Sequence, residues 1–183
     1  MRIIAGERRG LTLKTLPGTA YRPTLGRARE SLFGILTPAV PEARVLDLFA
    51  GSGALGLEAL SRGADSTLFV ENSPAAAKVI EANIAKARYQ ERCHIHLGDF
   101  RDIGKRVASG AEFDLVFADP PYLQGFPPQV IELVAARSLL SAKGYFALEF
   151  EVRETPDVIP VELEVIREKK FGATWIWIMR RKL

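Results

Sequence analysis

The sequence predicts an α/β fold in which a mostly parallel sheet carries helices on both faces. Three observations support this prediction. Apolar, β-prone runs alternate with helical patterns between residues 44 and 151, a glycine-rich turn directly follows the first run, and the last two strand-like runs have no helix between them. Alternating strands and helices form parallel sheets, whereas two strands joined by a short turn pair antiparallel. At 183 residues the chain fits one domain with a small appendage.

The N-terminal segment is expected to be a basic β-hairpin. Residues 1–16 alternate weakly between apolar and polar residues around a charged turn, which predicts a hairpin with Arg8 and Arg9 at its tip. Residues 1–30 contain seven basic and two acidic side chains, a net charge of +5, whereas the rest of the chain carries −2. This uneven distribution favours a polyanionic partner, most often a nucleic acid.

A helix is expected to follow the hairpin, from about Leu25 to Leu36, with Thr24 as its N-cap. Arginines near the start of this helix add positive charge where a helix N-terminus already favours anions. We therefore divide the chain into a basic extension, residues 1–40, and a main domain, residues 41–183. The residues expected to contact a nucleic acid are Arg8, Arg9, Arg22, Thr24, Arg27 and Arg29.

From residue 44 onward the chain is expected to build the sheet. The pattern predicts strands at 44–49, 67–71, 93–97, 113–118 and 144–151, with helices at 54–62, 74–87, 101–108 and 128–137. The runs 161–170 and 174–181 predict an antiparallel hairpin that closes one edge of the sheet.

Composition excludes several other classes of protein. The single cysteine, Cys93, allows neither an intrachain disulfide nor a cysteine-based metal site, and we expect no metal. His94 and His96 alternate along a predicted strand and are interpreted as edge residues without a metal role. The chain opens without a signal-peptide pattern and has no apolar run near the roughly 20 residues that cross a bilayer. We therefore expect a cytoplasmic protein without a membrane partner.

The glycine turn after the first strand predicts a ligand site. Gly51 and Gly53 can adopt positive φ and let a ligand approach the backbone, next to the free N–H groups of a helix start. With Gly56 they match the dinucleotide fingerprint, and Glu71 follows at the distance of a ribose-binding acid. Asp47, however, would repel a pyrophosphate by about 1 to 4 kcal/mol at ~4 Å. A sulfonium and ammonium ligand, S-adenosylmethionine (SAM), fits better.

Acidic residues follow four consecutive predicted strands, at Asp47, Glu71, Asp99 and Asp119. Ligands of open α/β sheets lie beyond the carboxyl ends of the strands, so these side chains are expected to surround one ligand. Asp99 is placed to accept from an adenine amino group, with Phe100 available to stack on the ring. A helix N-cap is an equally simple role for Asp99.

The sequence after the fourth strand, Asp119-Pro120-Pro121-Tyr122, is suited to holding an exocyclic amine. Such a nitrogen is a poor nucleophile because its lone pair is delocalised into the base. The Asp119 carboxylate and the Pro120 carbonyl could accept both amine hydrogens and turn the lone pair toward a methyl donor. Consecutive prolines fix φ, and Tyr122 offers a flat face for a flipped base. Orientation of this kind lowers a barrier without a covalent intermediate.

These motifs carry a family resemblance. Asp119-Pro120-Pro121-Tyr122 resembles the catalytic motif of SAM-dependent amino-methyltransferases, and Asp47-Leu48-Phe49-Ala50-Gly51-Ser52-Gly53 resembles their cofactor motif. Arg2-Ile3-Ile4-Ala5-Gly6 and Arg22-Pro23-Thr24 are similar to the N-terminal motifs of the RsmD family. That family methylates guanine N2 at nucleotide 966 of bacterial 16S ribosomal RNA. The family pattern has an acidic residue where this chain has Gly26. The resemblance therefore does not imply the local contact that the acidic residue would make.

The resemblance implies a Rossmann-like SAM-dependent methyltransferase fold with a seven-stranded, mostly parallel sheet and a reversed last strand. It implies a monomer that acts on 16S rRNA in the 30S subunit or an assembly intermediate. The cofactor-binding residues are then Asp47, Ala50, Gly51, Ser52, Gly53, Glu71, Asn72, Asp99 and Phe100, and the catalytic residues are Asp119, Pro120, Pro121 and Tyr122.

Other functions remain open from the residues alone. The amine-binding motif would also serve methylation of adenine N6 or cytosine N4 in RNA or DNA, or of a protein glutamine. The fold could belong to a non-catalytic RNA-binding assembly factor, and the glycine fingerprint to a nicotinamide-dependent oxidoreductase. Product analysis and ligand binding would separate these functions.

Overall fold

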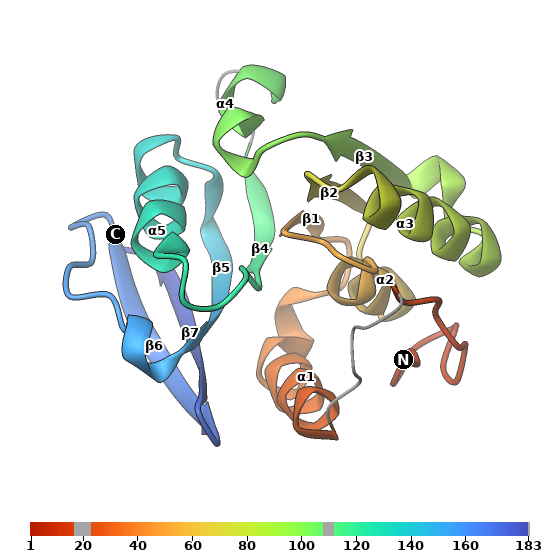
Figure 1. Ribbon diagram of the computed structural model, residues 1–183, viewed down its shortest axis with the longest axis horizontal. Helices are drawn as coiled ribbons and strands as arrows, with labels where there is room; N and C mark the ends of the chain where they lie inside the picture. Colours follow the sequence, from red (N-terminus) through yellow and green to blue (C-terminus); the bar gives the residue numbers. More distant parts are fainter. Residues whose placement is uncertain (17–22, 108–111, 183) are drawn as a thin grey trace.

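The computed structural model describes residues 1–16, 23–107 and 112–182. Its centre is one seven-stranded sheet with the strand order β3-β2-β1-β4-β5-β7-β6 (Figure 1). The first five strands of the chain are parallel, and β7 pairs antiparallel with both β5 and β6. The mostly parallel sheet and the antiparallel C-terminal hairpin agree with the sequence prediction, and the structure adds the strand order. Its strands are β1 (Arg44–Leu48), β2 (Ser66–Glu71), β3 (Cys93–Leu97), β4 (Phe113–Ala118), β5 (Leu140–Glu151), β6 (Leu163–Phe171) and β7 (Thr174–Arg181).

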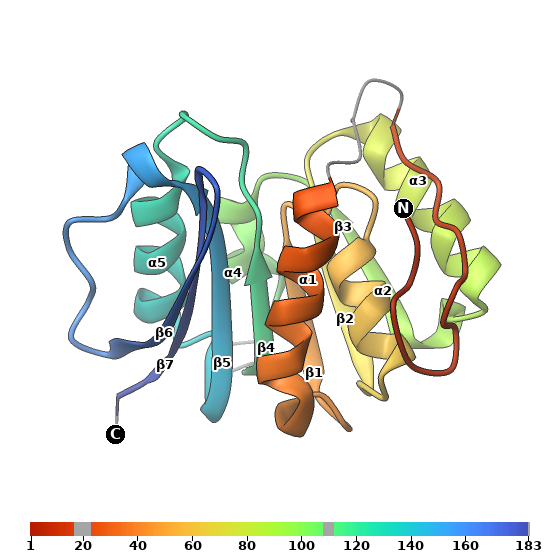
Figure 2. The same ribbon diagram turned by 90° about the horizontal axis from the view of Figure 1, so that it is seen from below.

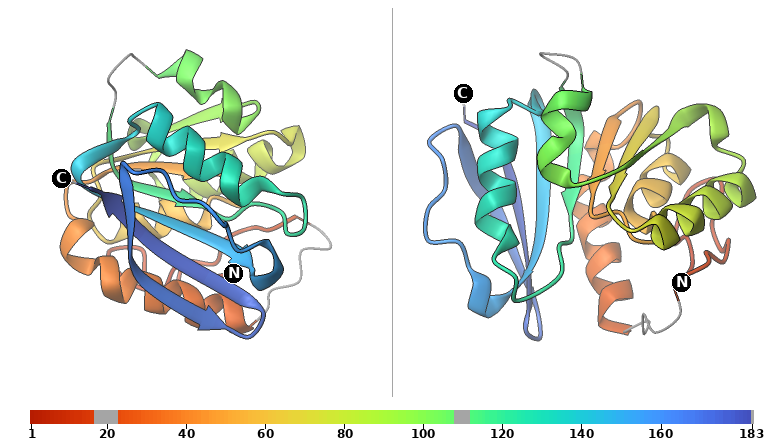
Figure 3. Two further views of the ribbon diagram at one scale, coloured as in Figure 1. Left: turned by 90° about the vertical axis from the view of Figure 1, so that its left-hand side faces the viewer. Right: turned by 45° about the horizontal axis from the view of Figure 1, so that its top comes forward.

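Helices cover both faces of the sheet (Figures 1 and 3). One face carries α1 (Pro23–Leu36), α2 (Ala54–Ser61) and α3 (Pro74–Ala87), and the other carries α4 (Ile103–Arg106) and α5 (Phe126–Ala136). Short 3-10 segments complete the fold: η1 (Thr37–Ala39), η2 (Gln90–Arg92), η3 (Phe100–Asp102) and η4 (Val152–Glu154).

Alternating side chains of the central strands enter two different cores. Leu46 packs in the cluster beneath α5, whereas its neighbour Val45 packs in the cluster beneath α1. Both side chains are fully buried, as expected for parallel strands that are covered on two faces. On the α1 side, the rings of Phe33 and Phe117 lie 5.5 Å apart and join the helix to β4. Apolar burial on both faces thus fixes the strand ends from which the loops emerge.

Some boundaries differ from the predicted ones. Helix α5 begins at Phe126, because Pro127 and Pro128 occupy its first turn, where no backbone N–H is needed. Strand β5 begins at Leu140, which pairs with Phe113 before a register shift. The predicted helix at 101–108 is reduced to η3 and the four-residue α4 among the residues that the structure describes.

The N-terminal segment folds back on itself but does not form the predicted two-stranded hairpin. It has a single antiparallel bridge, between Arg2 and Thr12, flanked by backbone hydrogen bonds. Longer strands cannot form because the N–H groups of Ile4 and Ala5 donate to the Glu58 carboxylate instead, at 2.7 and 3.0 Å. The segment is therefore attached to α2 as well as to its own second half.

The start of α1 also differs from the prediction. The helix begins at Pro23, so Thr24 lies inside its first turn and not at the N-cap. Proline is favoured at the first helical position because its φ is already helical and its missing N–H would have no partner there. Arg22 lies outside the described residues.

Candidate active site

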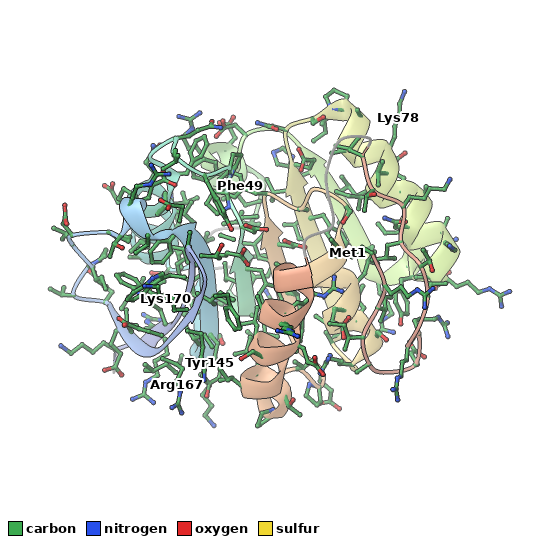
Figure 4. All side chains as sticks on the ribbon, turned by 60° about the horizontal axis from the view of Figure 1, so that its bottom comes forward. Met1, Phe49, Lys78, Tyr145, Arg167 and Lys170 are labelled. Carbon is green, nitrogen blue, oxygen red and sulfur yellow. The ribbon has the colours of Figure 1, made fainter. Side chains whose placement is uncertain are left out.

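A pocket of about 620 Å³ lies at the carboxyl ends of the parallel strands. The sheet order reverses there between β1 and β4, the place at which such folds bind ligands. Figure 2 shows the loops that follow β1 and β4, the start of α1 and the turn between β6 and β7 at the same edge. In Figure 4, Phe49 lies at this edge between the hairpin bearing Lys170 and Arg167 and the helix bearing Lys78. The pocket is lined by Phe49, Gly51, Val70, Glu71, Asn72, Gly98, Phe100, Asp119, Pro120, Pro121, Tyr122, Gln124, Phe126, Phe171, Gly172, Ala173 and Thr174.

The glycine turn is as tight as its sequence predicts. Gly51 and Gly53 have φ of 57° and 75°, and Gly53 is the residue directly before α2. Of the turn, Gly51 lines the pocket, whereas Ala50, Ser52 and Gly53 do not. Gly56 serves packing instead, because a Cβ there would lie 2.4 Å from the Phe69 ring. Only the first glycine thus offers its backbone directly to a pocket ligand.

Asp47 lies beneath the turn and not at the pocket surface. Its side chain is only 1% exposed, and its Oδ2 accepts the Gly56 N–H at 2.9 Å. Burial raises its pKa to about 8. The hydrogen bond from the Gly56 N–H opposes this shift, whereas the negative charge of Glu71 adds to it. The predicted direct contact of Asp47 with a ligand is therefore not provided by this geometry. The carboxyl instead holds α2 against the turn.

Glu71 is placed as the sequence predicts, at the end of β2 and in the pocket wall. Its two oxygens accept the backbone N–H groups of Gly51 and Ser73, each at 2.8 Å. A carboxylate oxygen can accept a second hydrogen bond, so both remain able to receive ligand hydroxyls. Asn72 lines the wall beside it. The carboxylate is thus fixed in orientation before any ligand arrives.

Three phenylalanines form an apolar wall of the pocket. Phe49 has a positive φ of 60°, and its ring centre lies 4.7 Å from that of Phe100 and 5.4 Å from that of Phe126. All three line the pocket, as predicted for Phe100 alone. Phe126 follows a proline-rich loop and could have been suspected only from its position near Tyr122. The wall is suited to a flat, uncharged ring.

Asp99 does not line the pocket. Its two oxygens each accept from the Arg101 guanidinium at 2.7 Å, and Oδ1 also accepts the Arg101 N–H. The same hydrogen bonds lower its pKa. This carboxylate caps η3, the simpler of the two roles considered above. The sequence alone cannot distinguish a ligand contact from an N-cap at Asp99, because Arg101 could pair with the carboxylate in either role.

The predicted catalytic residues, from Asp119 to Tyr122, lie together in the pocket wall. The Asp119 side chain is reachable from the pocket, yet protein atoms desolvate it, which raises its pKa well above the ordinary range. The neighbouring negative charges of Glu149 and Asp47 raise it further.

Glu149 is an unpredicted member of the site. It accepts the Tyr122 hydroxyl at 2.8 Å, and Thr174 lies 3.2 Å from the same hydroxyl. Burial raises the pKa of Glu149, although the Tyr122 hydrogen bond opposes the shift. An acidic residue inside the apolar run of β5 was the available signal. These two partners fix the plane of the tyrosine ring.

The predicted RNA-contacting arginines are not equivalent. Arg9 and Arg27 are exposed. Arg8 is half-buried, donates to the Ala87 carbonyl at 2.8 Å and lies over the Tyr89 ring. Arg29 is only 7% exposed and donates to the Arg2 carbonyl at 2.6 Å, so its guanidinium holds the N-terminal segment instead of facing a partner.

Two features are absent from residues 1–16, 23–107 and 112–182. No group of three His, Cys, Asp or Glu side chains in these ranges could hold a metal ion. No helix in them is long and apolar enough to cross a membrane.

Comparison with known proteins gives consistent matches. The family model described as conserved hypothetical protein 95 matches residues 1–180. Ribosomal RNA small subunit methyltransferase D of Escherichia coli is 34% identical over 177 residues, covering 94% of this chain and 85% of that protein. The solved structure of Escherichia coli yhhF has a TM-score of 0.87 at 32% identity, covering 100% of this chain and 98% of that one. The structure of SMU.776 complexed with SAH is similar in fold, with a TM-score of 0.68 at 13% identity, covering 87% of this chain and 50% of that one.

Proposed function

On the premise that the chain belongs to the RsmD family of ribosomal RNA small subunit methyltransferases, we propose that it methylates the exocyclic N2 amine of a guanine in 16S rRNA, with SAM as methyl donor. The observation that carries this proposal is one pocket lined by Gly51 of the glycine turn, Glu71, the aromatic wall and the residues from Asp119 to Tyr122.

The pocket fits SAM better than a dinucleotide. Its described lining contains the carboxylates of Glu71 and Asp119 and no Lys or Arg side chain. A pyrophosphate would meet repulsion there, whereas a sulfonium would be attracted. Glu71 would hold the ribose hydroxyls, and the wall that includes Phe100 would hold the adenine ring. The SAH bound to SMU.776, a protein of the same fold, is compatible with this assignment.

The acceptor amine would be held by Asp119 and Pro120. SAM, when bound, supplies the electrophilic methyl group. The Asp119 carboxylate and the Pro120 carbonyl accept the two amine hydrogens, so the nitrogen lone pair points to the donor. As the N–C bond formed, the S–C bond of the donor would break with its electron pair left on sulfur, and the amine proton would move to an Asp119 oxygen.

The substrate would reach the pocket from the edge at which α1 begins. The basic extension, residues 1–40, would contact phosphates there through the exposed Arg27 near the start of α1. Arg9 is also exposed, but its turn lies beside the C-terminal ends of α2 and α3, at the opposite edge of the sheet. We propose that the enzyme works as a monomer in the cytoplasm on the 30S subunit or an assembly intermediate.

Replacement of Asp119 tests this function. In Asp119→Ala we expect the rate of methyl transfer from labelled SAM to unmethylated small-subunit particles to fall by about 100-fold or more, because one positioned charged acceptor is lost. The affinity for SAM, measured by calorimetry, should change by less than about threefold. Asp65→Ala, at an exposed aspartate, is the matched control and should retain full activity. Full activity of Asp119→Ala would refute the proposed role.

A further inference from the structure

Leu123 directly follows the predicted catalytic residues and has an unusual setting. Its neighbours Tyr122 and Gln124 both line the pocket, whereas Leu123 does not. Its side chain is 55% exposed, although leucine is one of the most apolar residues. The loop between β4 and α5 that carries it projects beyond the strand ends at the pocket edge (Figure 2). An isolated exposed leucine needs no explanation by itself, but this one has two further features.

The first feature is the backbone of Leu123. Its φ is 60°, in the left-handed region that residues with a Cβ rarely adopt. Glycine removes this strain and occurs two residues later, at Gly125, with a φ of 70°. A strained conformation persists only where the surrounding structure imposes it, and such residues concentrate at functional sites. The structure therefore keeps a leucine at a position that glycine would occupy more easily.

The second feature is a set of contacts that hold this backbone. The Glu154 carboxylate, from η4, accepts the Leu123 N–H with one oxygen and the Gly125 N–H with the other. Gln129 donates to the Gly125 carbonyl at 2.9 Å, and the preceding residue, Tyr122, is fixed by Glu149. The loop is thus held on both sides of Leu123. The side chain is presented to solvent by a rigid support and not by a loose loop.

We propose that Leu123 is a wedge that enters the RNA base stack at the place left by the target guanine. This inference rests on the proposed function. A base within a stack cannot reach a pocket amine acceptor, so the nucleotide has to swing out, at a cost in stacking energy. Apolar side chains inserted between bases offset that cost. Leu123 is the exposed apolar side chain between two pocket-lining residues. When the target base enters the pocket, this side chain lies at the gap that the base leaves in the stack.

The test compares Leu123→Ala, which shortens the wedge, with Leu123→Met. Methionine is unbranched, but it keeps an apolar side chain of similar size at this position. Val161→Ala is the control, since Val161 is 81% exposed and does not line the pocket. For each variant, kcat and the particle Kd are measured with unmethylated small-subunit particles, and SAM affinity and Tm with the protein alone. We expect kcat of Leu123→Ala to fall roughly tenfold or more, while the particle Kd, the SAM affinity and Tm stay near wild type. Leu123→Met and Val161→Ala should keep kcat within about threefold.

Each other outcome is decisive. A kcat of Leu123→Ala within twofold of wild type would overturn the wedge and leave the proposed function intact. A loss confined to the particle Kd would also overturn it, because Leu123 would then dock the protein without assisting base extrusion. A wild-type protein that methylates no RNA would overturn the proposed function first, and the wedge with it.

Discussion

At the scale of single residues, the acidic side chains of the site differ in role because they differ in surroundings. Glu71 faces the pocket with both oxygens already held by backbone N–H groups. Asp119 faces it, and desolvation, with the neighbouring negative charge of Glu149, raises the pKa of its carboxyl. Asp47 does not reach it and supports the turn from below. Two of these acidic side chains thus face the pocket, whereas the third stabilises the glycine turn.

The buried Asp47 makes stability depend on pH. Its pKa is 3.8 in an unhindered chain and about 8 in the folded protein, so between these values the folded state holds a proton that the unfolded state releases. The free energy of unfolding should therefore decrease as pH rises from 5 to 7.5, by at most about 1.4 kcal/mol per pH unit from this residue. Urea titrations of wild type and Asp47→Asn measure the effect. The asparagine does not titrate, so its curve should be flatter; parallel curves would contradict the account.

How much of the site could be predicted also varies residue by residue. Glu71 and the residues from Asp119 to Tyr122 are predictable because they lie at the ends of clear strands. Their side chains also match the groups expected there, ribose hydroxyls and an exocyclic amine. Glu149 is not, since its partner Tyr122 lies 27 residues away in the sequence and only the sheet brings them together. For Asp99 the sequence allows a ligand role or an N-cap, and the local ion pair with Arg101 in the structure accompanies the N-cap.

At the scale of elements, the N-terminal segment depends on one buried carboxylate. Glu58 of α2 is fully buried, accepts two N–H groups of the segment and forms an ion pair with Arg62 at 2.8 Å. Asn83 of α3 adds a second attachment, because its amide bonds Lys14 and also the Ser52 carbonyl of the glycine turn. The basic extension is therefore joined to the cofactor side of the molecule through α2 and α3.

Removal of the Glu58 carboxylate should release this segment. We expect Glu58→Ala to lower the free energy of unfolding by about 3 to 5 kcal/mol, because it leaves two N–H groups and a guanidinium without their acceptor. Amide hydrogen exchange at Ile4 and Ala5 should accelerate with it. Glu81→Ala, at an exposed residue of α3, should change stability by no more than about 0.5 kcal/mol. Unchanged exchange at Ile4 and Ala5 would show that other contacts hold the segment.

Residues 1–16 show which features a local sequence pattern can predict and which depend on contacts with distant residues. The turn around Arg8 and Arg9 was predictable from charge and glycine. The diversion of the N–H groups to Glu58 was not, because an acid in the middle of an apolar helix reveals only that it has a buried partner. Arg29 is similar: its charge suggests RNA, whereas its place on the inner side of α1 makes it an internal support.

At the scale of the whole molecule, the sheet order collects residues from the full length of the chain at one edge. Strand alternation predicts the parallel core, and the helix-free ending predicts the reversed hairpin; both are confirmed. The contribution of the turn at 171–174 to the pocket could not be predicted, because it depends on how far β7 extends beside β5. The fold is thus more predictable than the composition of the pocket wall.

The central claim is that this edge directs a guanine amine toward a cationic methyl donor. The most direct measurement treats small-subunit particles that lack the modification with the protein and isotopically labelled SAM, then analyses the rRNA nucleosides by mass spectrometry. The account predicts labelled N2-methylguanosine with the wild-type protein and its loss with Asp119→Ala. Label in another nucleoside would contradict the account. So would the absence of label from every nucleoside when the particles are intact.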